Sequence, residues 1–142
     1  MDFFVRKFVN EDYEQVLHVW QETAMGGAQR GDDLKVIENT LNQGGDLFVL
    51  VEKESDKVIG SSWITNDSRR LYLHHFGILP EFQGKGLSHL LMKVSMDLAR
   101  ELKLQIKLEV HKNNQIASKL YESYGFQYLG DYQVFIVRNI SE

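Results

Sequence analysis

The sequence contains no cysteine and only one proline among its 142 residues. The lack of cysteine excludes disulfide bonds, thiolate zinc sites and a cysteine nucleophile, and it suits a reducing compartment. No apolar run approaches the length of a membrane-spanning helix, and the charges of Asp2, Arg6 and Lys7 come too early for a signal peptide. We therefore expect a cytoplasmic protein with no membrane partner.

The chain also lacks a strong excess of either charge. Its 16 basic and 20 acidic residues are interspersed and give a net charge of −4. This balance disfavours a nucleic-acid partner and leans towards a cationic substrate. The 43% hydrophobic and 25% charged content is typical of a globular protein. Because no repeat, low-complexity tract or linker interrupts the sequence, we expect one domain over residues 1–142.

Hydrophobic periodicity predicts an alternation of strands and helices. The predicted strands cover residues 3–9, 47–52, 58–65, 71–79, 104–110, 126–129 and 132–138. The predicted helices cover about 12–23, 33–41, 87–102 and 114–124, the second capped by Asp32 or Asp33. The irregular segment 25–31 is expected to be a mobile loop. The whole pattern indicates a mixed α/β fold.

A glycine-rich turn joins the fourth predicted strand to the third helix. It reads Gln83-Gly84-Lys85-Gly86-Leu87-Ser88 and follows an apolar run that ends at Pro80. The N–H groups of a helix N-terminus attract anions, and glycines let a phosphate approach the backbone closely. Two nucleotide fingerprints fail: His89 stands where a dinucleotide loop needs glycine, and Gly86 stands where a Walker loop needs Ser or Thr. A sharp turn without a ligand is the alternative.

Two motifs carry a family resemblance. Residues 78–88 resemble the acetyl-CoA signature of the GNAT superfamily of N-acetyltransferases, Gln/Arg-x-x-Gly-x-Gly/Ala after a Val-x-Pro segment. Gln83 and Gly86 match its fixed positions, and Ser88 replaces the usual small Gly or Ala. Residues 108–126 resemble the family's later motif, with Asn-x-x-Ala, Leu-Tyr-Glu and Gly-Phe in order. Together the motifs and the strand–helix pattern cover nearly the whole chain.

The resemblance implies a GNAT-like domain with a central, mostly antiparallel sheet of about six to seven strands and about four helices. It also implies transfer of the acetyl group of acetyl-CoA to a primary amine of a small molecule or peptide. The amine would attack directly in a ternary complex, without a metal. The residues expected to contact acetyl-CoA are Phe76, Gly77, Ile78, Gln83, Gly84, Lys85, Gly86, Leu87, Ser88, Asn114, Ala117 and Tyr121. An acetyl-CoA sensor without turnover, or an unrelated phosphate-binding protein, are the alternatives.

The resemblance also assigns roles to single residues. Tyr121 matches the tyrosine that commonly protonates the departing thiolate, although it could equally be a core aromatic. Asn114 either contacts the cofactor or caps its helix. Lys85 either contacts the pyrophosphate or is a surface lysine.

The general base is left open among several groups. His74 and His75 lie on the strand before the loop, where the family often places its base. Strand alternation puts His75 on the core face and His74 with Tyr72, so we favour His74. A β-bulge would reverse this parity and favour His75. Tyr72, Glu109 and a water molecule are further candidates, and a structural histidine is the alternative.

The acceptor is not identified by the sequence. Glu22, Arg30, Asp32 and Asp33 lie in the segment where such enzymes usually bind it, and the acidic ones could hold a cationic amine or simply be solvated. The oligomeric state is equally open. A homodimer is common among similar proteins, and the apolar segment 132–137 suits either an interface or an interior strand.

Overall fold

A five-stranded sheet forms the centre of the computed structural model, which describes residues 2–23 and 31–141. Its strands are β1 (Phe3–Lys7), β2 (Asp46–Glu52), β3 (Lys57–Asn66), β4 (Arg70–Ile78) and β5 (Gln105–Leu108). They lie in the order β1-β2-β3-β4-β5. Neighbours are antiparallel except for the parallel pair β4 and β5. The first five predicted strands are thus confirmed.

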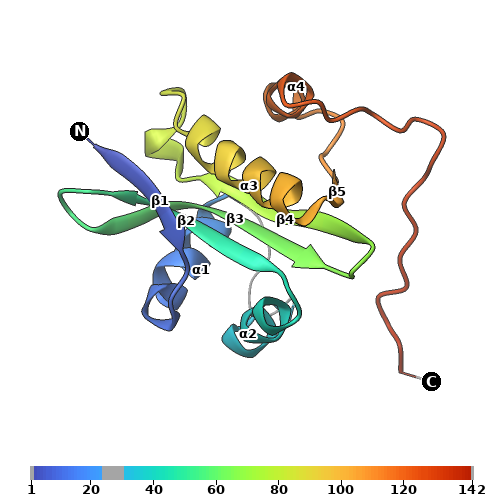
Figure 1. The fold of residues 1–142 in the computed structure, drawn as a ribbon, viewed down its shortest axis with the longest axis horizontal. Coiled ribbons are helices and arrows are strands. Elements are labelled where there is room, and N and C mark those ends of the chain that lie inside the picture. Colours follow the sequence, from blue (N-terminus) through green and yellow to red (C-terminus); the bar gives the residue numbers. More distant parts are fainter. Residues whose placement is uncertain (1, 24–30, 142) are drawn as a thin grey trace. The chain divides into compact units, whose positions relative to one another are not determined.

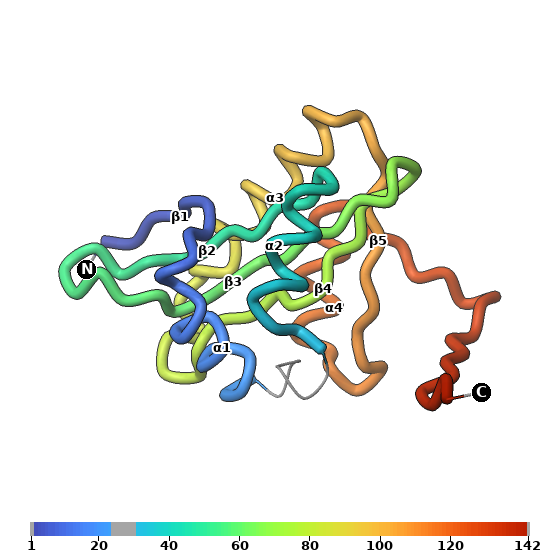
Figure 2. Tube along the Cα trace, turned by 90° about the horizontal axis from the view of Figure 1, so that it is seen from below, coloured from blue at the N-terminus to red at the C-terminus, as the bar shows by residue number. Residues whose placement is uncertain are grey.

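Helices cover both faces of this sheet (Figure 1). The helices are α1 (Tyr13–Glu22), α2 (Leu34–Asn42) and α3 (Ser88–Leu102), with single 3-10 turns at Asn10–Asp12 and Pro80–Phe82. Figure 2 shows α1 and α2 together on one face, and α3 lies on the other. Of the two predicted caps of α2, Asp33 is the one used, since its carboxylate accepts a hydrogen bond of 3.0 Å from the Val36 N–H.

The core explains why the central strands are so apolar. All residues of β2 after Asp46 are buried because helices cover both faces of the sheet. Trp20 of α1 and Ile37 of α2 fill one side, and Leu91 and Met92 of α3 fill the other, all with no exposed surface. The helix periodicity identified α1, α2 and α3 because each has one such buried face.

The chain divides into two compact units, Met1–Glu109 and Val110–Glu142. The second unit contains one helix, α4 (Gln115–Ser123). Asn114 caps it by accepting a hydrogen bond of 3.2 Å from the Ala117 N–H. Gly125 follows the helix with a φ of +95°, the left-handed conformation expected of a glycine in this position.

The two strands predicted at 126–129 and 132–138 are wrong. The described residues after Ser123 form turns and irregular backbone, so the sheet has five strands rather than six to seven, while the fold class is confirmed. Alternating apolar residues make a strand only when a neighbouring strand supplies hydrogen bonds. Here the apolar side chains stay exposed, as in Tyr132, Phe135 and Val137. No described helix has the length and apolar character needed to cross a membrane.

Candidate active site

The glycine-rich loop is held in place by the side chain of Gln83. Its Nε2 donates a hydrogen bond of 2.8 Å to the carbonyl oxygen of Ile78, the last residue of β4. Gly84 and Gly86 then adopt positive φ values of +78° and +74°, which side-chain-bearing residues rarely adopt. The glutamine of the motif therefore shapes the loop.

The backbone of this loop has the properties of an anion site. Within the described chain, the N–H groups of residues 84–88 donate no hydrogen bond to another group. A Cβ placed on Gly84 or Gly86 would meet no atom within 4 Å, so the space in front of the backbone is open. Ser88 begins α3, whose dipole adds positive potential there. These features fit a pyrophosphate.

Lys85 projects from the same loop. Its ammonium nitrogen lies 5.7 Å from the centre of the Phe82 ring, a cation–π distance. The side chain is exposed. A phosphate contact by Lys85 stays a prediction.

The second half of β4 has an open edge. Its pairing with β5 ends at Leu73 and Leu108, so residues 74–78 have no strand partner on that side among the described residues. On the other side, the Leu79 N–H donates a hydrogen bond of 2.8 Å to the carbonyl oxygen of Ile59 in β3. Because neighbouring residues of a strand point their N–H groups to opposite sides, the Ile78 N–H faces the open edge. An extended ligand could pair with the backbone there.

A β-bulge decides which way the two histidines face. Ser62 pairs with Phe76 and Ile64 with Leu73, so the single residue Trp63 opposes both His74 and His75. The predicted alternation breaks at this point, so the prediction that His75 shares the core face of Leu71 and Leu73 is wrong. Both imidazoles instead lie beside Trp63, with ring centres 5.6 Å and 5.4 Å from it.

His75 is part of a hydrogen-bonded network under α1. Its Nε2 lies 2.9 Å from the Asp32 carboxylate, and both side chains are only about one fifth exposed. Its ring centre lies 4.7 Å from that of Trp20, which in turn stacks on Trp63. The Trp20 indole donates to the Ser61 hydroxyl, and that hydroxyl donates to the His75 carbonyl. The histidine is thus fixed both by its side chain and by its backbone.

His74 lies further towards the solvent. Its Nε2 is 2.7 Å from the Thr65 hydroxyl, and its ring stacks on Tyr72 at 4.3 Å. Desolvation by these neighbours, with the nearby His75 second, lowers the pKa of His74 to about 4. The imidazole is therefore neutral at physiological pH. Burial and a hydrogen bond to Glu109 raise the pKa of Tyr72, so its phenol is protonated.

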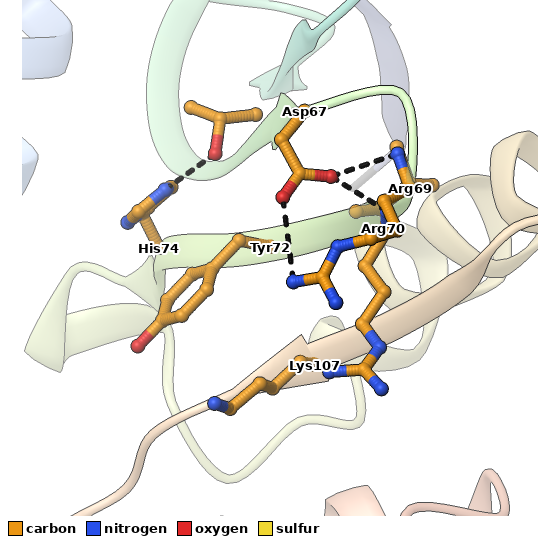
Figure 3. A pocket seen from close by; sticks show the side chains of 8 residues that line it. Asp67, Arg69, Arg70, Tyr72, His74 and Lys107 are labelled. Carbon is orange, nitrogen blue, oxygen red and sulfur yellow. Dashed lines mark hydrogen bonds and ion pairs between the residues drawn. The ribbon is translucent and has the colours of Figure 1, made fainter. Parts of the chain in front are cut away.

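A small cavity extends from His74 towards the start of β4 (Figure 3). Its volume is about 250 Å³. Besides His74 and Tyr72, the charged side chains that line it are Asp67, Arg69, Arg70 and Lys107. The sequence does not predict this cluster, because Lys107 lies far from the neighbouring Arg69 and Arg70 in the chain and the three residues match no motif. The pairing of β4 with β5, which places Lys107 opposite Tyr72, brings Lys107 to the two arginines.

The proposed thiolate acid lies in the second unit. Tyr121 is 9% exposed, its ring packs edge-on against Phe126, and burial raises the pKa of its phenol. It is therefore protonated at neutral pH. The cap interpretation of Asn114 is confirmed, whereas contacts of Asn114 and Ala117 with a cofactor stay predictions.

Two of the three acidic residues expected near the acceptor, Asp32 and Asp33, have structural partners. Asp32 contacts His75, and Asp33 caps α2. Arg30 and most of the predicted loop 25–31 lie outside the described residues. No three His, Asp or Glu side chains of the described chain are grouped so that they could hold a metal ion.

Comparison with known proteins identifies the family. The model of the acetyltransferase (GNAT) family matches residues 11–126. An acetyltransferase from Streptococcus agalactiae 2603 is similar in structure, with 20% identity, 97% of this chain and 92% of that chain covered, and a TM-score of 0.75. A glucosamine-6-phosphate N-acetyltransferase from Arabidopsis thaliana is also similar in structure, with 14% identity, 99% of this chain and 99% of that chain covered, and a TM-score of 0.76.

A third structure contains the expected donor. It is a GNAT family acetyltransferase from Elizabethkingia anophelis with acetyl-CoA bound, with 15% identity, 88% of this chain and 76% of that chain covered, and a TM-score of 0.65. At these identities the structures establish the fold alone, and the family match covers most of the sequence. The chain therefore belongs to the acetyltransferase (GNAT) family.

Proposed function

We propose that this protein is an N-acetyltransferase that moves the acetyl group of acetyl-CoA to a primary amine. The observation that carries the proposal is the open glycine-rich loop, with its N–H groups unpaired within the described chain, directly after the free edge of β4. Acetyl-CoA, when bound, supplies an activated acetyl group as a thioester. The alternative is a sensor or interaction module that binds acetyl-CoA without turnover.

The loop and the strand edge would hold different parts of the donor. The backbone of residues 83–88 would bind the pyrophosphate, as its unpaired N–H groups and positive potential favour. The edge of β4 at residues 76–78 would pair with the pantetheine arm as an added strand does. The Ile78 N–H, which faces that edge, would polarise the thioester carbonyl.

The reaction needs two proton movements. The amine nitrogen bonds to the acetyl carbon while the carbon–sulfur bond breaks, so the amine loses a proton and the thiolate gains one. We assign the second step to the Tyr121 phenol, which burial keeps protonated. Its match to the family's Leu-Tyr-Glu motif supports this assignment.

For the amine proton, the structure favours His75 as the proposed acceptor over His74, which strand alternation favours. The Asp32 carboxylate beside Nε2 of His75 leaves Nδ1 as the proton acceptor. His74 is neutral, but its pKa of about 4 makes it a weak base towards an ammonium group. Its Nε2 is also occupied by Thr65. Transfer through a water molecule is compatible with either histidine.

One panel of assays tests the proposed function. Acetyl-CoA is incubated with amino acids, polyamines, aminoglycosides, amino sugars and peptides while release of free CoA is followed, and CoA binding is measured by calorimetry. Release with at least one amine, confirmed as acetyl-amine by mass spectrometry, supports the enzyme. Tight CoA binding without release on any amine supports the sensor. Absence of CoA binding would contradict both.

A further inference from the structure

The charged side chains of the cavity at the start of β4 have no role in the reaction described above. Its lining carries three cationic side chains, those of Arg69, Arg70 and Lys107, against the single carboxylate of Asp67. The protein as a whole has a net charge of −4. A local excess of positive charge beside Tyr72 and His74 is therefore a property of this cavity and not of the general surface.

The carboxylate of Asp67 is already engaged by its own turn. It accepts hydrogen bonds of 2.8 Å and 2.7 Å from the N–H groups of Arg69 and Arg70, which lower its pKa, and it lies 4.0 Å from the Arg69 guanidinium. The Asp67 carboxylate thus stabilises the turn, and Arg69 is the only one of the three cations that it can neutralise.

The two other cations, Arg70 and Lys107, form no ion pair with a carboxylate among the described residues. Arg70 donates its Nε–H to the neutral side chain of Gln105 at 3.1 Å. The Lys107 ammonium has no carboxylate within ion-pair distance in the part of the chain that the structure describes. Glu109, which follows β5, accepts the hydrogen bond of Tyr72. Figure 3 shows Arg70 and Lys107 reaching the cavity from neighbouring strands.

These cations are badly placed for the phosphates of the donor. Arg70 begins β4 and the glycine-rich loop follows its other end at Ile78, about 26 Å away at the usual rise of a strand. His74 and His75 lie between these two points along β4, and the bulge puts both side chains on the same face as Tyr72. An acceptor with its amine at the histidines would extend towards Arg70 and Lys107.

We propose that this cavity binds an anionic group, a carboxylate or a phosphate, of the acceptor amine; the proposal rests on the proposed function. Arginine and lysine are the side chains that bind such groups most strongly. Lys107 is level with Tyr72, about 7 Å along the strand from His74 and about 10 Å from His75. The acceptor should therefore carry its anion roughly 7 to 10 Å from its amine. Such an acceptor carries an anion besides its ammonium group and so differs from the purely cationic substrate that the net charge favours.

Matched pairs of amines test the proposal. Glucosamine-6-phosphate is compared with glucosamine, and δ-aminovalerate with n-pentylamine, each by calorimetry in the presence of CoA and by CoA release from acetyl-CoA. We expect the anionic member of at least one pair to bind about tenfold more tightly, the effect of one charge-assisted hydrogen bond. A preference in only one pair identifies a phosphate or a carboxylate as the anion.

Variants locate the binding site. Lys107→Gln and Arg70→Gln should each reduce the ratio of anionic to neutral affinity several-fold, whereas Arg100→Gln on α3 should leave that ratio at its wild-type value. Equal binding of both members of both pairs would overturn the proposal, as would a ratio that neither cavity variant changes. Because calorimetry needs no turnover, a protein that binds the anionic amines selectively without acetylating them contradicts the proposed function alone.

Discussion

The two proposed halves of the site are built in different ways. The half assigned to the donor is a backbone structure, in which glycines with positive φ expose N–H groups at the start of α3. The half assigned to the acceptor is a set of side chains that a β-bulge and the β4–β5 pairing bring together. Backbone recognition depends on a contiguous motif, whereas side-chain recognition depends on register. The predictions below test this distinction, from the largest expected effect to the smallest.

Tyr121→Phe would test whether a side chain is also essential on the donor side. Loss of a general acid typically reduces turnover about 100- to 10,000-fold. We expect kcat to fall in this range while the CoA dissociation constant, measured by calorimetry, stays unchanged. Tyr132→Phe, at an exposed position of the same unit, serves as the control. An unchanged kcat would remove Tyr121 from the mechanism.

Gly86→Val would break the donor half. Valine is strained at a φ of +74°, and its side chain would occupy the approach of the phosphates. We expect CoA binding about 100-fold weaker, as for the loss of one or two hydrogen bonds to a charged group. Gly31→Val has a comparable strain at a φ of +88° but lies outside the loop, so it should retain CoA binding. Equal losses in both variants would contradict a backbone phosphate site.

Asp32→Asn would weaken the acceptor half alone. Asparagine cannot supply the charge that orients His75, so we expect kcat/KM to fall about tenfold, a part of the usual contribution of a general base. CoA affinity should be unchanged. Asp33→Asn is the matched control, because asparagine caps a helix as well as aspartate does. If His74→Asn lowers kcat/KM and Asp32→Asn does not, His74 is the base.

The smallest expected effect concerns stability. The pKa of His74 is about 4 in the folded protein against 6.5 ordinarily. Between these pH values the unfolded chain binds the extra proton, so the free energy of unfolding falls as the pH falls. His74→Asn should reduce this loss between pH 6.5 and 4 in urea titrations. His18→Asn, at an exposed position of α1, is the comparison. An identical pH slope in His74→Asn and wild type would contradict the lowered pKa.

The same distinction explains what could be predicted from sequence. The loop from Gln83 to Ser88 and the helices were predicted because contiguous motifs and one buried face per helix define them. The orientation of His75 was wrong because one extra residue in β4 shifts the alternation, and no residue type marks that bulge. The cluster of Arg70 and Lys107 was missed because it needs the β4–β5 register. The prediction of the last two strands is wrong because alternating apolar residues indicate which face of a strand would be buried, but not whether a neighbouring strand is there to pair with it.

The most direct test of the two-part site is a titration with CoA followed by amide ¹H–¹⁵N NMR. If the donor half is a backbone site, the Gly84 and Gly86 amide signals shift most strongly. The amides of Arg70 and Lys107, at the other end of β4, then shift little. Large shifts at Arg70 and Lys107 with unchanged Gly84 and Gly86 signals would contradict the account.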